Sequence, residues 1–562
     1  MNEKFFYFAA TALFFIRIWL GRTAGVFIEI FQYLDDMLLI NYADFEGHFG
    51  GENLPANLAL LKDMGYPIFL NLVKISGLSY VDWLSITWLI AAIMTVIFFK
   101  ELTGNKNKKI WLLIYAYVLF QPVAFTYIGL RVYRNAILTQ FYLITLEMLA
   151  IVFLIYFREK IFHFKKIFLW SFALGIIFSW TYYLKEDGIW LLICLLAVIA
   201  ICAVKIFFSA TNKHKKFLSA VALILPLIIF ASVTNYYKSV NEKYFGVSLI
   251  NNRTEGELGK FCKLIYKIKS DERSNEIWAA TDSILQAFEA SETLRRNEIL
   301  KEKILHTAWF NGDIVKNPIR GDFLTWVMVE ELKNSGVSQN PVEQENFLRQ
   351  VNLELERAFA EGKLQKEDRI QLVSSMGGKT WKEIFDLRSL IFEIYYAHIF
   401  CPDESYGIVS SQPEHVWYSY DSEENQKQEL RNKYAEQVKK VSSTTNMNFF
   451  AGNEKSETAA IIIKFLRKIY GAINLILFVI GLAGIILSLK NFWREKETLM
   501  IGICAFLLSG VYAFAISWFA DFLSGIGLLI TYSSGVISML IIFELAGGFL
   551  FYKFFEGISV KC

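Results

Sequence analysis

Two adjacent carboxylates, Asp35 and Asp36, follow the first long apolar stretch of the chain, which runs from residue 5 to 27. Charge beside the hydrocarbon region of a membrane is costly unless it is solvated, paired or used in function. A carboxylate with an ordinary pKa near ~4 is ionised at neutral pH and can accept a proton from a hydroxyl group. This acid pair therefore has two interpretations: a general base at a membrane surface, or a solvated cap of an interfacial helix.

Cationic side chains stand at two other places in the chain. Lys62 precedes a Gly-Tyr-Pro sequence at 65–67, and Arg131 and Arg134 lie one helical turn apart at the end of an apolar stretch. The planar guanidinium of arginine can contact two phosphate oxygens at once. The alternative interpretation is that these long side chains only snorkel toward the interface.

Other polar residues fall near the same predicted surface. Glu186 and Asp187 lie in a tight turn between two apolar stretches, where their hard oxygens could orient an acceptor or bind Mg²⁺ or Mn²⁺, or could simply be solvated. His48 could position a substrate, although a loop histidine without function is the simpler interpretation. Asp521 and Tyr532, near the ends of the last two apolar stretches, could line the same cavity.

Composition places the chain in the membrane. Of its 562 residues 54% are hydrophobic, and the mean hydropathy of +0.36 is too high for a soluble globular protein. Stretches of about 20 apolar residues can cross the roughly 30 Å hydrocarbon core. Ten spans are predicted, at 5–27, 83–99, 110–128, 135–157, 167–184, 188–208, 217–236, 469–489, 498–518 and 524–551. The Lys/Arg and Asp/Glu contents of residues 237–458 are roughly balanced, so nucleic-acid binding is not indicated.

The basic residues of the short connections predict the orientation. They gather on one side of the predicted bundle: Lys100, Lys106, Lys108, Lys109, Arg158, Lys160, Lys165, Lys166, Lys213, Lys215, Lys216, Lys490, Arg494, Lys496, Lys553 and Lys561. The positive-inside rule makes that side cytoplasmic. Both termini are then cytoplasmic, which agrees with an even number of spans, and the acid pair is extracytoplasmic.

The spans divide the chain into three parts. Residues 1–236 form a membrane block with a long first outer loop at about 28–82, and residues 459–562 hold the last three spans. Between them, residues 237–458 are polar and are predicted to form an extracytoplasmic domain.

Helical periodicity predicts that this middle domain is mostly helical. It recurs at 276–305, at 381–397 and at 341–359, where Asn340 and Pro341 are a suitable start. Cys262 and Cys401 both fall in this part. Whether they pair is left open, because sequence does not show their separation.

The layout resembles that of the GT-C glycosyltransferases, multi-span enzymes that include protein O-mannosyltransferases and lipid A aminoarabinose transferases. Three features carry the resemblance. The first is the acid pair in Tyr33-Leu-Asp-Asp36. The second is the stretch from Lys62 to Leu70, which leads into an apolar segment at 68–75 that is too short to span and is expected to lie in the interface. The third is a long first outer loop, then closely spaced spans and a large late outer domain.

This resemblance implies a fold and an activity. The fold is an α-helical polytopic membrane protein of about ten transmembrane helices. The activity is the transfer, with inversion, of a sugar from a polyprenyl-phosphate donor to a glycan, lipid or protein acceptor in cell-envelope glycan synthesis. By the same resemblance Asp35 is the expected general base, with Asp36 in reserve, and Lys62 contacts the leaving phosphate. No cofactor is implied beyond a possible divalent cation.

Three other function classes stay open. A transporter or flippase of lipid-linked sugars usually carries polar or broken helices near mid-membrane, often in repeats. Here the predicted charges concentrate at the outer surface, and Glu544 is the exception within the last span. A repeat-unit polymerase or ligase would also act on lipid-linked glycans outside, and a membrane scaffold would need only a partner surface.

Overall fold

The structure is a computed structural model that describes residues 2–24, 26–28, 33–44, 58, 60–158, 164–209, 212–373, 376–402, 436, 439–449, 457–526 and 529–559. Within these ranges the chain forms helices and turns, with isolated β-bridges and no β-strand. Nine helices of the described part are long and apolar enough to cross a membrane, the architecture of an α-helical multi-pass membrane protein. His48 lies outside the described residues.

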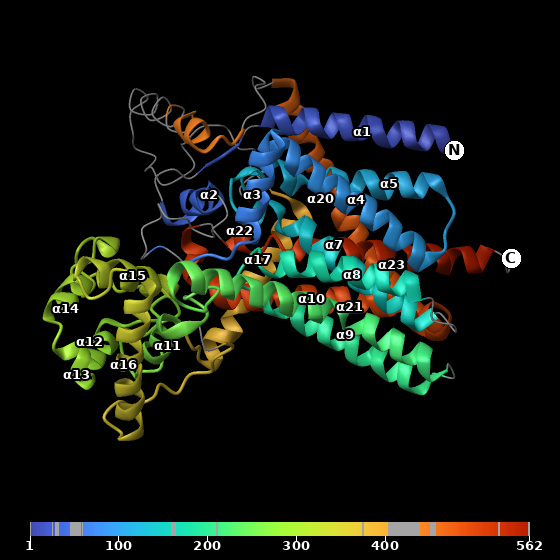
Figure 1. Ribbon diagram of the computed structural model, residues 1–562. Coiled ribbons are helices and arrows are strands. Elements are labelled where there is room, and N and C mark those ends of the chain that lie inside the picture. Colours follow the sequence, from blue (N-terminus) through green and yellow to red (C-terminus); the bar gives the residue numbers. More distant parts are fainter. Residues whose placement is uncertain are drawn as a thin grey trace.

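The long helices lie side by side in one bundle (Figure 1). They are α1 (Glu3–Ala24), α4 (Tyr80–Thr103), α7 (Asn135–Arg158), α8 (Phe164–Tyr182), α9 (Ile189–Phe208), α10 (Lys213–Phe245), α20 (Glu457–Ser488), α21 (Phe492–Ala520) and α23 (Val536–Ser559). Helix α7 is apolar on all sides and buried along nearly its whole length, as expected for a helix surrounded by others. Helix α1 begins, and α23 ends, at the same end of the bundle (Figure 1).

The predicted span at 110–128 is not one helix. It consists of α5 (Lys108–Leu119), the 3₁₀ turn η3 (Pro122–Phe125) and the short helix α6 (Tyr127–Leu130). The break follows from Pro122, which lacks an N–H and disfavours helical backbone in the residue before it. Helix α5 packs on α1, where the Tyr115 hydroxyl donates to the Ala10 carbonyl oxygen at 3.1 Å.

A second group of helices covers the opposite end of the bundle (Figure 1). This helical unit consists of α11 (Gly256–Ile265), α12 (Thr281–Ala290), α13 (Glu292–Arg295), α14 (Glu298–Leu305), α15 (Leu324–Asn334) and α16 (Pro341–Ala360). Helix α16 confirms the helix predicted at 341–359: the Asn340 side chain accepts the backbone N–H of Glu343 at 3.0 Å, and Pro341 is the first helical residue. The periodic segment 276–305 is three short helices, and the predicted boundary at 237 lies inside α10.

Tight apolar contacts join the helical unit to the bundle. A Cβ on Gly321 would come within 2.3 Å of the Phe522 ring, and the Trp278 ring centroid lies 5.2 Å from that of Phe522. Beside them Lys379, which is almost fully buried, pairs with Asp521 at 2.7 Å. The Asp521 carboxylate, predicted as a cavity residue, thus holds Lys379 at this junction.

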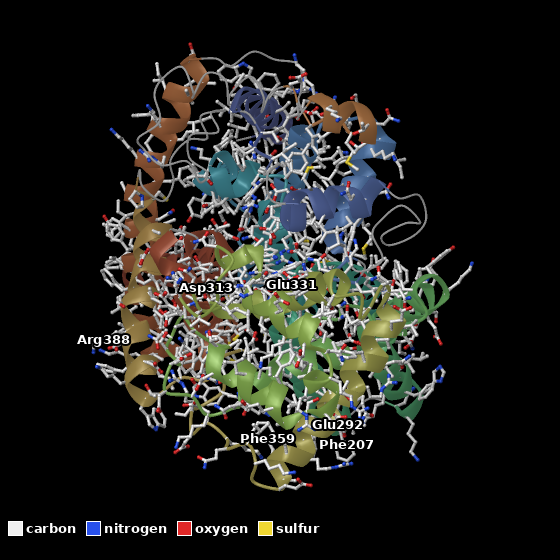
Figure 2. The ribbon with its side chains drawn as sticks, turned by 90° about the vertical axis from the view of Figure 1, so that its left-hand side faces the viewer. Phe207, Glu292, Asp313, Glu331, Phe359 and Arg388 are labelled. Carbon is white, nitrogen blue, oxygen red and sulfur yellow. The ribbon has the colours of Figure 1, made fainter. Side chains whose placement is uncertain are left out.

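Helix α17 (Trp381–Phe400) belongs to the bundle rather than to the helical unit. Its start is fixed by a capping box between Thr380 and Glu383, in agreement with the helix predicted from residue 381. It packs on α20 and α21. Figure 2, which looks at the bundle from the end covered by the helical unit, shows the helix that carries Arg388 running along one edge of the view.

Cys262 and Cys401 do not form a disulfide in the structure. Cys262, on α11, and Cys401, just after α17, are both buried free thiols, so they do not pair.

Candidate functional site

The acid pair lies on a turn of π-helix, η1 (Tyr33–Met37), which leads into α2 (Leu38–Asp44). Its surroundings are set by a short parallel pairing of two segments far apart in the chain. The backbone N–H of Phe27 donates to the Leu130 carbonyl oxygen at 3.2 Å, and that of Val132 donates to the Phe27 carbonyl oxygen at 2.8 Å. This pairing places Arg131 beside both carboxylates.

Asp36 is fully enclosed and bound to Arg131. The Arg131 Nε donates to both Asp36 oxygens, at 2.8 and 3.0 Å, and a second guanidinium nitrogen lies 2.7 Å from Oδ1. The Tyr80 hydroxyl, itself bonded to that of Tyr66, donates to the Arg131 carbonyl oxygen at 2.7 Å. Asp36 therefore orients Arg131 and has no exposed surface to offer an acceptor.

Asp35 is the accessible member of the pair, with 30% of its side chain exposed. Lys62 Nζ donates to its Oδ1 at 3.0 Å, and Arg131 lies 3.6 Å from its Oδ2. Burial alone would raise the pKa of Asp35, but the charges of Lys62 and Arg131 outweigh it and lower the pKa to about 2. Asp35 is therefore ionised throughout the neutral pH range.

Lys62 is buried, and backbone hydrogen bonds on both sides of it fix its segment in place. The backbone N–H of Asn252 donates to the Leu60 carbonyl oxygen at 2.8 Å, and that of Gly65 donates to the Tyr183 carbonyl oxygen at 2.7 Å. A Cβ on Gly65 would come within 2.5 Å of that same oxygen, so only glycine allows this approach. The contact joins the Lys62 segment to the turn between α8 and α9.

That turn carries Glu186, which is held by two arginines. Arg134 donates to one Glu186 oxygen, and Arg253 lies 3.4 Å from the other. Burial would raise the pKa of Glu186, but Arg134 and Arg253 lower it well below its usual range. The Arg253 guanidinium also pairs with Asp322 at 2.5 Å, which extends the ion-pair network into the helical unit.

Both carboxylate oxygens of Asp187 already have hydrogen-bond or ion-pair partners. It accepts hydrogen bonds from the hydroxyls of Tyr142 at 2.8 Å and Tyr512 at 2.9 Å, and it pairs with Lys185 at 2.9 Å. Since Glu186 is likewise occupied, these two carboxylates do not fit a divalent cation in this arrangement. Across the described residues, no group of three or more His, Cys, Asp or Glu side chains is placed to hold one.

Two aromatic rings lie under the cations. The Tyr133 ring centroid is 4.6 Å from the guanidinium of Arg131, 5.1 Å from that of Arg134 and 5.8 Å from the Lys62 ammonium. The Trp326 ring centroid is 4.9 Å from the Lys62 ammonium and 4.5 Å from the Arg253 guanidinium. Each close pair favours the charged form of the cation in a site with little water.

Tyr532, on the short helix α22 (Leu529–Tyr532), also belongs to the site. Its ring centroid lies 5.2 Å from the Lys185 ammonium. Burial raises the pKa of the Tyr532 hydroxyl, and the nearby charge of Asp35 raises it further. The structure thus brings together Asp35, Asp36, Lys62, Arg131, Arg134, Glu186, Asp187 and Tyr532, all of which were singled out from the sequence.

Among the residues that contact the predicted charged groups, Tyr133, Arg253, Asp322 and Trp326 were not predicted. Tyr133 lies between the two predicted arginines in Arg-Val-Tyr-Arg, a pattern that could have pointed to it. Arg253, Asp322 and Trp326 come from the segment between the membrane blocks, and no motif marks them. Their participation means that the middle segment contributes side chains to the site itself.

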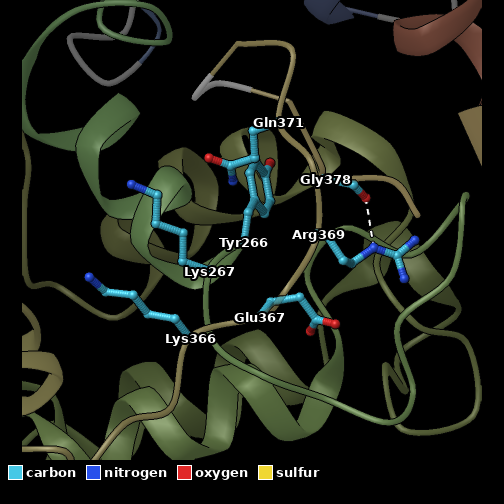
Figure 3. A pocket seen from close by; sticks show the side chains of 7 residues that line it. All are labelled: Tyr266, Lys267, Lys366, Glu367, Arg369, Gln371 and Gly378. Carbon is cyan, nitrogen blue, oxygen red and sulfur yellow. Dashed lines mark hydrogen bonds between the residues drawn. The ribbon is translucent and has the colours of Figure 1, made fainter. Parts of the chain in front are cut away.

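A cavity of about 160 Å³ is lined by the segments that follow α11 and α16. Figure 3 shows its lining residues, Tyr266, Lys267, Lys366, Glu367, Arg369, Gln371 and Gly378. Arg369 Nε donates to the Gly378 carbonyl oxygen at 2.8 Å, and Glu367 accepts the backbone N–H of Ser270 at 3.2 Å. These two charged side chains brace neighbouring segments, and none of the predicted site residues lines the cavity.

Comparison of the chain with protein-family models, with curated proteins and with solved structures found no match.

Asp63, next to Lys62, makes the stability of the folded protein depend on pH. It is buried and accepts a hydrogen bond from the Asn251 side chain at 3.1 Å. Burial, followed by the charge of Glu186, raises the pKa of Asp63 from 3.8 to about 7. The charge of Glu255 also raises this pKa, whereas the charge of Arg134 lowers it. The folded protein then holds a proton that the unfolded chain releases, so this contribution to stability is lost as pH rises from about 4 to about 7.

We expect Asp63→Asn to raise the thermal unfolding midpoint of the detergent-purified protein more at pH 8 than at pH 5. The amide keeps an oxygen for Asn251 and carries no charge at either pH. Asp386→Asn, at an exposed position, is the matched control and should change the midpoint little at both values. An equal gain for Asp63→Asn at pH 5 and pH 8 would contradict the titration of this carboxyl.

Proposed function

We propose that the chain is a membrane glycosyltransferase of the GT-C type, which moves a sugar from a polyprenyl-phosphate donor to an acceptor hydroxyl. The observation that carries the proposal is the state of Asp35. It is the partly exposed carboxylate of the acid pair, is ionised, and stands between the buried cations Lys62 and Arg131 at the end of an apolar helix bundle. A donor whose lipid tail stays in the bilayer would present its phosphate at such a place.

The reaction needs one proton acceptor and cations for the leaving group. The acceptor oxygen attacks the anomeric carbon, the bond from that carbon to the phosphate oxygen breaks, and the acceptor proton passes to Asp35. The electron pair of the broken bond leaves on the polyprenyl phosphate, beside Lys62, Arg131 and Arg134. A single displacement of this kind inverts the anomeric carbon.

The ion pairs suggest how donor binding would activate the base. Without a donor, Lys62 and Arg131 are neutralised by Asp35 and Asp36, and Arg134 by Glu186. A bound phosphate competes with Asp35 for Lys62. Because Lys62 is one of the groups that lower the pKa of Asp35, drawing it away makes Asp35 a stronger base when the donor is in place.

The helical unit is the part of the chain placed to meet the acceptor. Its side chains Arg253, Asp322 and Trp326 join the network, and the predicted orientation puts them outside the cell. Polar and aromatic side chains of this kind suit a hydroxyl-rich acceptor, such as a glycan or a glycosylated lipid or protein of the envelope.

One observation favours a second candidate, a transporter of a lipid-linked sugar. Among the described residues, two carboxyl groups are enclosed within the bundle: Glu147 on α7, and Glu544 on α23, which accepts a hydrogen bond from the Tyr117 hydroxyl at 2.6 Å. Carboxyl groups inside a membrane protein are typical of proton relays in transporters.

Proteoliposomes that carry the labelled donor separate the two candidates. With polyprenyl-phosphate sugars labelled in the sugar and a water-soluble glycan extract as acceptor, a transferase moves label into the water-soluble fraction and releases unlabelled polyprenyl phosphate. A transporter moves label to the other leaflet, still attached to lipid. We expect transfer, and we expect Glu147→Gln and Glu544→Gln to retain it. Movement across the bilayer that stops in these two variants, without transfer, would replace the glycosyltransferase by the transporter.

A further inference from the structure

Helix α17 carries a row of exposed aromatic side chains. Trp381, Phe385, Phe392, Tyr396 and Phe400 fall on one side of the helix because their spacings are close to whole numbers of turns. Trp381 is 77% exposed and Phe392 71%. The rings of Phe392 and Tyr396 stack with centroids 6.4 Å apart. So much exposed aromatic surface on one helix marks a contact with something other than water.

The opposite side of α17 is fixed to the bundle. Leu387 and Ile394 are buried there, and the hydroxyls of Tyr395 and Ser509, on α21, lie 2.6 Å apart. Farther along, His398 Nε2 is 3.0 Å from the Ser533 hydroxyl. The helix therefore cannot rotate to bury its aromatic row.

A third side of α17 is charged. Lys382, Asp386 and Glu393 are exposed and, at 100° per residue, project next to the aromatic row and away from the buried face. The helix thus meets three surroundings at once: protein, water and an apolar phase. A helix that contacts only protein and water would not need an exposed aromatic side.

The position of α17 identifies the apolar phase. The helix lies across the bundle rather than along it (Figure 2), on α20 and α21. The same two helices expose large apolar side chains of their own, among them Ile476 and Val479 on α20 and Leu507 and Val511 on α21. In a helix bundle that crosses a bilayer, such surface faces lipid, and the aromatic row of α17 continues it.

We propose that α17 is an interfacial anchor, which seats its aromatic row in the lipid headgroup layer at the site end of the bundle, with Arg388 contacting a lipid phosphate. Arg388 projects on the aromatic side, its guanidinium 3.8 Å from the centroid of the Phe385 ring. Aromatic rings are enriched at this depth of a membrane, and arginine beside them reaches the phosphates. Because His398 holds Ser533, next to Tyr532, the anchor also sets the height of the site above the lipid.

Spin labels at neighbouring positions test the anchor in the full-length protein reconstituted in liposomes. Labels are placed on cysteines at Phe392 or Glu393, and at Phe385 or Asp386, after the native cysteines are replaced by serine. All four positions are exposed in the structure, so the pairs are matched. We expect labels at 385 and 392 to collide more often with oxygen, which concentrates in lipid, and labels at 386 and 393 with a water-soluble nickel chelate.

A second measurement needs no cysteine replacement. Benzoylphenylalanine in place of Phe392 in the otherwise native chain should crosslink on illumination to radiolabelled phospholipid in the liposomes, several-fold more than in place of Glu393. Equal access of the nickel chelate to 392 and 393 would place α17 in water and overturn the proposal. Crosslinking of position 392 to protein instead of lipid would show that another chain covers the row, and would overturn it as well.

Discussion

Asp35→Asn is expected to lower sugar transfer by about 100- to 10,000-fold, the usual contribution of a general base. The asparagine side chain has the same shape and can still accept a hydrogen bond from Lys62, but it cannot take up the acceptor proton. The partly exposed position of Asp35 lets water replace part of the lost charge, so the variant should remain folded. The loss is therefore expected in the rate of transfer. Donor binding should not weaken, because the phosphate no longer competes with a carboxylate for Lys62.

The measurement is transfer from labelled polyprenyl-phosphate sugars in membranes that contain equal amounts of wild type and variant. Asp35→Glu is the matched control, because it restores a carboxylate displaced by one methylene group and should recover part of the rate. Full transfer by both Asp35→Asn and Asp36→Asn would show that the acid pair only caps the interfacial turn. The transporter and polymerase interpretations would then come first.

The elements of this site could largely be predicted from the sequence. Apolar stretches separated by short connections determine which polar segments share an end of the bundle, so the acid pair, Lys62 and the two arginines were expected near one another. The prediction of the spans was wrong at two places. At 110–128 a single proline is the reason, since Pro122 interrupts a stretch that is apolar enough to span. The last span, predicted at 524–551, begins only at Val536, after the short helix α22.

The roles within the acid pair could not be predicted. Adjacent residues on a helix point about 100° apart, but sequence does not say which one meets the protein. That choice depends on the pairing of Phe27 with the segment around Arg131, which encloses Asp36 and leaves Asp35 open. Arg253 was beyond prediction for a similar reason, since it meets Glu186 across 67 residues of sequence through a contact between two separate parts of the fold.

The contact of α17 with the bundle and its exposed aromatic row could not be predicted from its composition. Its charged residues and its place between the membrane blocks are typical of a soluble domain, and the segment was accordingly predicted within the extracytoplasmic part. The aromatic row becomes informative only when the buried face is known, because the same residues could equally have formed the core of a soluble helix pair. The contacts of Tyr395 and His398 with the bundle decide this.

Asp36→Asn is expected to act on stability. It removes one partner of a buried ion pair and leaves the Arg131 guanidinium short of a counter-charge, a change that costs about 3–5 kcal/mol. Asp82→Asn is the matched control at the same end of the bundle. Asp82 pairs with Arg22 at 2.8 Å, but the Arg22 side chain is 39% exposed, and pairs open to water contribute only about 0–1 kcal/mol. The thermal unfolding midpoint in detergent should fall clearly for Asp36→Asn and little for Asp82→Asn.

The double variant Asp36→Asn/Arg131→Gln separates a structural role of Asp36 from a catalytic one. Removing both charges leaves no uncompensated cation in the enclosed space, so the midpoint should recover part of what Asp36→Asn loses. Transfer should stay low, because the leaving phosphate has lost one of its cations. If Asp36→Asn instead unfolds at the wild-type temperature and abolishes transfer, then Asp36 is the base and Asp35 only neutralises Lys62. The enclosed Asp36–Arg131 pair predicts a different result for each position. Asp35→Asn should lose transfer but not stability, and Asp36→Asn should lose stability.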